Sequence, residues 1–230
     1  MAGKSCTRIG GLFIYYEKGC QRPRTINEDW EHQFEVLPWM AYLTAIPHAI
    51  FMVTTLKENG IANAALHGWS SFTGEGDSYF VIMPVIRRTH TYANIVREKE
   101  WCVNFLSAKY IEMCKETIRR NRVDTDEISA AGFSAVRSAT ISAPGIEESF
   151  LRLECVYQWE KELLQGSTNV LICGKVKHLS VEGCFVTSKV TDRYGPDSFV
   201  FHLMAMKDPF TGERIKGGIG RIELTKSMEL

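Results

Sequence analysis

The sequence lacks an excess of charge of either sign: 27 lysines and arginines stand against 27 aspartates and glutamates in 230 residues. Proteins that bind nucleic acid or an anionic membrane surface usually present a strong positive field. We therefore expect neither nucleic acid nor a membrane as a partner. A bound anion would have to be held by a local cluster of residues.

The sequence also lacks a long hydrophobic run. Its most apolar stretch, residues 37–53, is shorter than a bilayer requires and is interrupted by Pro38, Pro47 and His48. Residues 1–10 are polar and hold no apolar segment typical of a secretory signal. The seven cysteines are odd in number and form no C-x-x-C pair, which favours free thiols in a reducing compartment. A cytoplasmic location is therefore expected.

Several catalytic motifs are missing. The segment around Ser70 lacks the second glycine of a G-x-S-x-G turn. Gly3-Lys4-Ser5 lacks the upstream glycine of a phosphate loop. Gly218-Ile219-Gly220 does not lie in a predicted βαβ unit, which a Rossmann glycine motif requires. The six histidines form no i, i+4 pair with a flanking acid, so a zinc hydrolase is unsupported. We expect no metal and name no catalytic residue.

What the sequence does contain is a series of strand patterns. Asn59-Gly60 predicts a tight hairpin turn. Runs rich in β-branched and aromatic residues predict strands at 49–56, 61–72, 77–84, 101–106, 151–159, 169–181 and 199–204. Helices are predicted at 91–98 and 109–131. Strands and helices do not alternate, which favours a mainly β, α+β fold: a closed antiparallel barrel with helices on its rim.

Basic and hydroxyl side chains gather where a strand gives way to a helix. Arg87, Arg88, Thr89, Thr91 and Asn94 lie at this junction. A helix N-terminus presents unpaired N–H groups and partial positive charge, and arginines add charge-assisted donors. The pattern suits a phosphate or another anion. It suits equally well a solvated loop with an N-cap threonine.

Small residues gather between Gly60 and Ser71. The alanines of this segment would let a flat ligand approach the backbone, with Asn63 and Ser70 as polar contacts and Trp69 as an apolar wall. A flavin ring needs backbone N–H donors at its carbonyl edge and apolar faces. The alternative is a bulged strand in which Trp69 belongs to the core.

The two segments, in this order, resemble the flavin reductase-like family with the FMN-binding split-barrel fold, in its flavoredoxin branch. The resemblance runs from about residue 49 to residue 181. It is carried by 52–55, 59–65, the surroundings of Trp69, 87–95, 101–105, 143–155 and 172–176. It implies an antiparallel, Greek-key-like barrel with helical insertions.

The resemblance also implies a cofactor site. Positions that match the family and would line the ring and ribityl chain are Asn63, Ala64, Ala65, Trp69 and Ser70. Those that would face or support the phosphate are Arg87, Arg88, Thr89, Thr91 and Asn94. Thr54 and Thr55 would end a strand near the ring.

The function that the resemblance implies is an FMN-binding flavin oxidoreductase that uses NAD(P)H, in a homodimer with FMN near the subunit interface. Two alternatives stay open: an FMN electron carrier reduced by a protein partner, and a binding barrel that has lost flavin. Residues 1–36 read as an N-terminal extension before one domain at 37–230. The extension has no counterpart in the family, and the tail at 207–214 differs from its shorter members. We expect such segments to cover the flavin and to alter which donor or acceptor fits.

Overall fold

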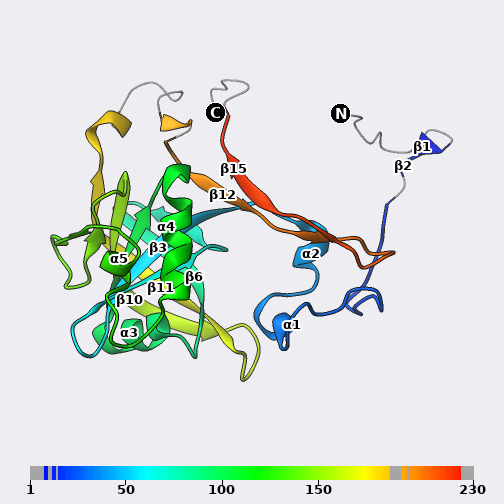
Figure 1. The fold of residues 1–230 in the computed structure, drawn as a ribbon, viewed down its shortest axis with the longest axis horizontal. Coiled ribbons are helices and arrows are strands. Elements are labelled where there is room, and N and C mark those ends of the chain that lie inside the picture. The colour runs from blue at the N-terminus through cyan, green and yellow to red at the C-terminus, as the bar shows by residue number, and fades with distance from the viewer. Residues whose placement is uncertain (1–7, 10–11, 14, 187–192, 196, 224–230) are drawn as a thin grey trace.

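The body of the protein is one antiparallel sheet. The computed structural model describes residues 8–9, 12–13, 15–186, 193–195 and 197–223. Within these ranges the sheet has nine strands (Figure 1): β3 (His48–Leu56), β4 (Ala62–His67), β5 (Ser71–Glu75), β6 (Ser78–Ile86), β7 (Glu100–Phe105), β10 (Leu151–Glu162), β11 (Asn169–Val181), β12 (Val200–Leu203) and β15 (Gly218–Arg221).

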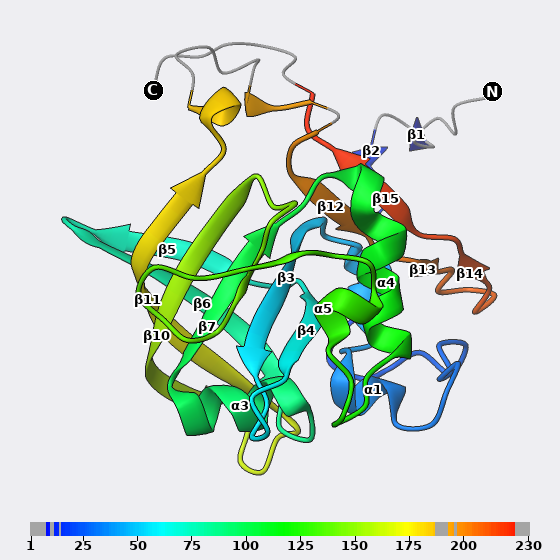
Figure 2. The ribbon, with the colours of Figure 1, turned by 60° about the vertical axis from the view of Figure 1, so that its left-hand side comes forward.

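Short helices pack on this sheet, and three pairs of two-residue strands lie outside it. α3 packs on β3 and β4, while α4 and α5 pack on β4; Figure 2 shows all three helices around these strands. The helices are α1 (Gln33–Val36), α2 (Ala41–Thr44), α3 (His90–Glu98), α4 (Ile111–Arg119) and α5 (Glu127–Ala130), with 3-10 turns at Ala108–Tyr110 and Gly183–Phe185. The small strand pairs are β1 (Arg8–Ile9) with β2 (Leu12–Phe13), β8 (Ala135–Val136) with β9 (Gly145–Ile146), and β13 (Met206–Lys207) with β14 (Arg214–Ile215).

The sheet does not close on itself. Its strands follow the order β15-β12-β3-β7-β10-β11-β6-β5, and β4 pairs only with β3. After β4 the chain turns at Gly68 and Trp69, where Trp69 has a φ of 59°, and continues into β5, which pairs with β6 instead of extending β4. The closed barrel expected from the strand pattern is therefore wrong, whereas the split barrel that the resemblance implied, mainly antiparallel with helical insertions, is confirmed.

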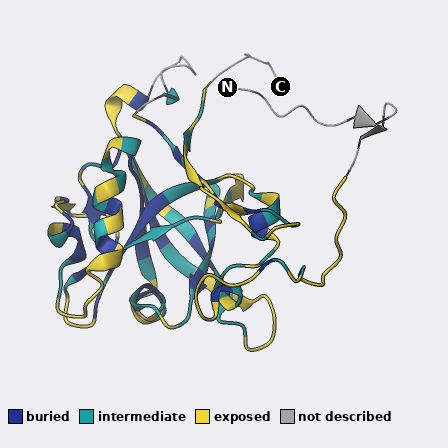
Figure 3. Cartoon of the chain, turned by 45° about the vertical axis from the view of Figure 1, so that its right-hand side comes forward, coloured by how far each residue is buried: buried dark blue, intermediate teal, exposed yellow. Residues whose placement is uncertain are grey.

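The core lies inside this curved sheet, where buried residues line the strands (Figure 3). Trp101 is fully buried at its centre. A Cβ at Gly174 would come within 2.2 Å of the Trp101 ring, so the glycine gives the indole its space. Cys102, Cys155 and Cys173 are buried free thiols, as expected of small hydrophobic residues.

Two predicted elements are divided. The helix predicted at 109–131 becomes α4 and α5, separated by a loop whose carbonyls bond to the β3–β4 hairpin: Lys57 Nζ donates to Arg122 O at 2.6 Å, and Asn59 Nδ2 to Val123 O at 3.1 Å. The Asp126 carboxylate then caps α5 by accepting from the backbone N–H of Ile128. The strand predicted at 61–72 is divided into β4 and β5 by the turn after β4.

Residues 15–44 and 204–215 pack together at one side of the barrel, where Figure 1 shows them beyond the sheet. Thr25 Oγ1 donates to Pro209 O at 2.6 Å, and Lys207 Nζ donates to the Asp29 carboxylate at 2.8 Å. α2 contacts β13. We call this unit the terminal arm. None of the helices in the described ranges has the length and apolar character needed to cross a bilayer.

Candidate functional site

A cavity of about 640 Å³ opens where β4 and β6 fail to pair. We call it the split cavity. Its walls come from β4 and the following turn, the ends of β6 and β11, the start of α3, the end of α4, and the segment after α1. Most lining side chains are apolar, and none of the described residues that line the cavity is a lysine or arginine. Such a cavity suits a largely apolar ligand fixed by a few polar groups.

β4 supplies one wall with its free edge. Ala64 N donates to Glu127 Oε2 at 2.9 Å, so the main chain of Ala64 points away from β3. Main-chain direction alternates along a strand, and the N–H and C=O groups of Leu66 therefore point to the same free edge. Small side chains at Ala64 and Ala65 leave this backbone within reach of a ligand.

The turn after β4 places a tryptophan beside the cavity. Trp69 lines it and is 43% exposed. The ring of His48 packs 4.8 Å from the indole, and a Cβ at Gly68 would lie only 2.4 Å from that imidazole. Gly68 therefore allows His48 to support Trp69. Ser70 is next in the chain but outside the lining; its hydroxyl donates to Gly68 O at 2.9 Å.

The start of α3 forms the polar end of the cavity. Thr89 is the N-cap: its Oγ1 accepts from Tyr92 N at 3.3 Å and donates to Ile86 O at 2.7 Å. Thr91 Oγ1 accepts from Asn63 Nδ2 at 3.2 Å, which joins α3 to β4. Both threonines and Asn63 line the cavity. The helix start thus brings hydroxyl groups and N–H donors to one place.

The two arginines before α3 differ in their partners. Arg87 donates to Glu162 Oε1 at 2.9 Å and to the Tyr92 hydroxyl at 2.8 Å, so its guanidinium is held on the outer face of β10. Arg88 is exposed beside Thr89, and it makes no ion pair with any residue that the structure describes. Neither arginine belongs to the lining. Of the two, Arg88 has the side chain that is free to turn towards an anion.

Three predicted site residues lie behind the wall. Thr54 and Thr55 are fully buried in β3, and Asn94 is buried in α3. Asn94 Nδ2 donates to Thr55 Oγ1 at 2.9 Å, while Thr54 Oγ1 accepts from Asn104 Nδ2 at 3.0 Å. None of the three is in the lining. Their hydrogen bonds fix β3 against α3 and β7, and so hold the wall in position.

A buried ion pair below β4 did not emerge from the sequence. Lys57 Nζ lies 2.8 Å from Glu127 Oε1, and both side chains are at most 3% exposed. The lysine also donates to Arg122 O and to Thr125 O, at 2.6 and 2.7 Å. Glu127 lines the cavity with its charge already matched. The only local signal was Asp126, a helix cap before Glu127; the partner lysine is 70 positions away.

His67 adds a ring but no charge. Burial lowers its pKa to about 4, so the imidazole is neutral at physiological pH. Its ring stacks on Phe51, with the two centroids 6.4 Å apart. Because Glu127 is paired and His67 is neutral, the interior of the cavity carries no uncompensated charge from these groups.

The segment after α1 closes another side. Val36, the last residue of α1, lines the cavity together with Leu37 and Pro38, so the end of the extension at 1–36 does reach the candidate site. The tail at 207–214, which was also expected to matter, contributes no lining residue in the described ranges and belongs to the terminal arm.

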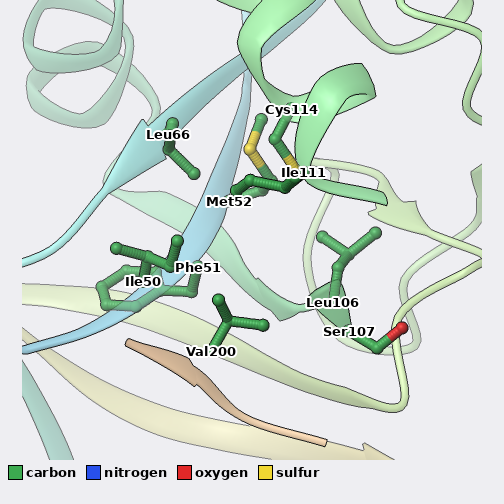
Figure 4. A pocket seen from close by; sticks show the side chains of 9 residues that line it. All are labelled: Ile50, Phe51, Met52, Leu66, Leu106, Ser107, Ile111, Cys114 and Val200. Carbon is green, nitrogen blue, oxygen red and sulfur yellow. The ribbon is translucent and has the colours of Figure 1, made fainter. Parts of the chain in front are cut away.

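A second cavity is much smaller than the split cavity. It lies between β3, β4, β12 and α4 (Figure 4), and its volume is about 10 Å³. Apart from the Ser107 hydroxyl, its lining is apolar. A space of this size holds at most a single water, so we regard it as a packing defect and not as a ligand site.

Comparison with known proteins agrees with this architecture. The model of the "Flavin reductase like domain" matches residues 43–190. A curated relative, the uncharacterised protein YwrF of Bacillus subtilis (strain 168), is 32% identical over 115 residues, which cover 49% of this chain and 56% of YwrF. The match thus spans little more than half of that relative's length.

Solved structures share the fold at low sequence identity. Nitrilotriacetate monooxygenase component B from Bacillus cereus has a TM-score of 0.66 at 19% identity, over 89% of this chain and 97% of that one. A split-barrel-domain protein from Shewanella frigidimarina NCIMB 400 has a TM-score of 0.67 at 14% identity, over 89% and 99%. Flavoredoxin from Methanosarcina acetivorans has a TM-score of 0.63 at 17% identity, over 80% and 89%.

The matched region contains every strand from β3 to β11, the start of α3 and all lining residues of the split cavity except Val36, Leu37 and Pro38. The family model covers well over half of the sequence. The chain therefore belongs to the flavin reductase-like domain family.

Proposed function

We propose that this protein binds FMN in the split cavity and passes electrons through it from NAD(P)H to an acceptor. The observation that carries the proposal is the meeting of a small-residue edge strand and a helix N-terminus in one cavity. The edge strand suits a flat heterocycle with a polar rim. The helix N-terminus suits a phosphate. FMN joins these two chemical groups in one molecule.

The residues present fit this cofactor. The free edge of β4 offers main-chain groups at Leu66 that β3 does not use. Thr89 and Thr91 bring hydroxyl groups to the α3 end. His90 lines the same end, and its Nδ1 is buried without a hydrogen-bond partner among the described residues. A buried polar atom without a partner is costly, and a phosphate oxygen would satisfy it.

Each part of the chain then has a role. Thr89, Thr91 and Arg88 would hold the phosphate, and Ala64 to Leu66 would orient the ring. When bound, FMN supplies a carrier that accepts a hydride and releases electrons. Hydride transfer depends on the approach of two rings and requires no acid or base. We therefore assign binding, orientation and exclusion of water to the protein, and no catalytic residue.

The partners belong to the same proposal. The donor would be NADH or NADPH, the acceptor a flavin or another redox partner, and the protein a homodimer. The neutral interior of the cavity supports a donor that enters as an uncharged ring, because no buried cation is present in the lining to attract a charged one.

FMN binding is tested by absorption and fluorescence spectroscopy of the purified protein. Purified protein incubated with FMN and desalted should keep the flavin absorption bands and quench flavin fluorescence. Ala65→Leu narrows the cavity beside β4 and should reduce the bound fraction. Ala135→Leu, which changes an exposed alanine of β8 outside the cavity, is the control. Protein that stays colourless would refute the proposal. Protein that binds FMN but oxidises neither NADH nor NADPH would be a carrier reduced by another protein.

A further inference from the structure

One wall of the split cavity lies outside the region that the family model matches. Val36, Leu37 and Pro38 are the only lining residues among those described that fall outside residues 43–190. We call these three residues the extension wall. The parts that would hold FMN, β4 and the start of α3, all lie inside the matched region. The family model therefore does not cover the extension wall, although it covers the rest of the lining.

The extension wall is held at one end by the barrel. Asn169 Nδ2, at the start of β11, donates to Val36 O at 3.1 Å and to Glu35 O at 3.5 Å. Asn169 is paired with Ile86, the last residue of β6, so this anchor stands directly before the α3 end of the cavity. The main chain of the wall is thus tied to the strands that border the proposed phosphate site.

The terminal arm holds the extension wall at its other end. Gln33 is 1% exposed; its Nε2 donates to the Tyr42 hydroxyl. Leu37 packs against the cluster of Ala41, Tyr42 and Met204. With hydrogen bonds on one side and apolar packing on the other, the wall has a defined position relative to the cavity.

The chemistry of the extension wall is apolar and uncharged. Its three side chains are aliphatic, and the exposed side chains of Ile118 and Leu163 line the cavity as well. A surface of this kind contacts the edge of a neutral ring favourably and gives no compensation to a charged group that loses its water. Reacting rings must approach closely for hydride transfer, so a side chain that lines the same cavity limits which second ring fits there beside the first.

We propose that the extension wall, through Leu37, is the specificity-determining surface for the second ligand: a small molecule with a neutral, planar ring, of which the nicotinamide of NAD(P)H is the test case. This inference rests on the proposed function, because it concerns the ligand that meets bound FMN. It assigns to the wall no part in holding FMN itself.

The experiment measures the binding of FMN and the binding of the dinucleotide separately. Wild type, Leu37→Ala and Leu37→Phe are loaded with FMN, and the bound fraction is measured by absorbance. Binding of 1,4,5,6-tetrahydro-NAD and 1,4,5,6-tetrahydro-NADP, analogues whose ring is uncharged and donates no hydride, is then measured by calorimetry. Both substitutions should weaken dinucleotide binding by about tenfold, the effect of a misfitted side chain in an apolar pocket, and should leave FMN affinity within about twofold. The KM for the reduced dinucleotide should rise in parallel.

The control is Trp30→Ala. Trp30 is a large, 45% exposed residue of the same extension that does not line the cavity, and its removal should change neither affinity. Leu37→Phe keeps an apolar side chain against Tyr42, so the test survives if Leu37→Ala loosens the arm. Unchanged dinucleotide affinity in both loaded variants would overturn the inference, as would loss of FMN from both. Wild-type protein that binds no FMN would instead refute the proposed function.

Discussion

At the residue scale, we expect a large loss in the free energy of unfolding when one member of the Lys57–Glu127 pair is replaced. Both side chains are buried, and the carboxylate also accepts from Ala64 N in the cavity wall. Removing one member of a buried pair leaves an uncompensated charge, which costs about 3–5 kcal/mol. We expect Glu127→Ala to lower the free energy of unfolding by this amount in urea denaturation.

The control for that prediction is an ion pair on the surface. Glu112→Ala breaks the exposed Glu112–Lys115 pair of α4 and should cost less than about 1 kcal/mol. The double variant Lys57→Met/Glu127→Leu removes both buried charges and should recover most of the lost stability. Equal destabilisation by Glu127→Ala and Glu112→Ala would show that the buried pair contributes no more than a surface pair.

The two arginines before α3 should differ in their effect on FMN affinity. Arg88 is exposed beside the N-cap and makes no ion pair within the described ranges, whereas Arg87 is bound to Glu162 and Tyr92. Loss of a charge-assisted contact costs about 1.5–3 kcal/mol. We expect Arg88→Ala to weaken FMN binding by this amount, measured by fluorescence titration, and Arg87→Ala to weaken it less. The reverse order would assign the phosphate to Arg87.

His67 should make the apoprotein sensitive to acid. Burial lowers its folded-state pKa from 6.5 to about 4, so between these two pH values the unfolded chain binds more protons than the folded one. Stability therefore falls as the pH drops from 6.5 towards 4. His67→Gln, which cannot titrate, should show a shallower fall when unfolding is followed across this range. Parallel curves would mean that His67 is protonated equally in both states.

At the element scale, α3 depends on its first residue. The Thr89 hydroxyl accepts from Tyr92 N and donates to Ile86 O, and replacement of an N-cap threonine by alanine costs about 0.5–2 kcal/mol. Thr89→Ala should lower both the thermal stability and the affinity for FMN, and Thr89→Ser should restore both. If serine restores stability alone, the methyl group and not the hydroxyl matters for the ligand.

The sequence predicted those elements whose pattern is contained in a short stretch of chain, and it did not predict those that depend on distant contacts. β3, β7, β11 and the Asn59–Gly60 turn carry strong local patterns, and the structure has them at or within a residue or two of the predicted places. The break between α4 and α5 depends on Lys57, whose contacts with that loop are more than 60 residues distant in sequence. No local pattern contains such a contact.

The candidate site was predictable to a similar extent. Six of the expected residues line one cavity: Asn63, Ala64, Ala65, Trp69, Thr89 and Thr91. The remaining six lie beside or behind it. Residue type and order placed the two segments, but the direction of each side chain depends on strand register and on partners such as Glu162.

The sequence did not predict the strand β15, because its glycines carry no strand propensity. Its pairing with β12 makes it a strand.

At the scale of the whole molecule, several large apolar side chains are exposed on the hairpins of the barrel. Trp159, Leu164 and Leu179 are 43%, 76% and 56% exposed. The three are spread along the β10–β11 hairpin, and we take them as separate candidate contacts with a second copy of the chain. We expect light scattering to give twice the 26.1 kDa of one chain, and Leu179→Lys to shift the protein to the monomer. A wild-type mass of one chain would refute the proposed homodimer.

The terminal arm has a consequence for the order of assembly during synthesis. Asp29 and Lys207 are 178 residues apart, and Met204 completes the apolar cluster that holds Leu37. A ribosome that adds about 5–20 residues per second needs roughly ten to forty seconds to make the second partner after the first. The strands from β3 to β11 can meet earlier, but the last side of the cavity must wait for nearly the whole polypeptide to emerge. A nascent chain stalled shortly before residue 204 would present the barrel with that side still open.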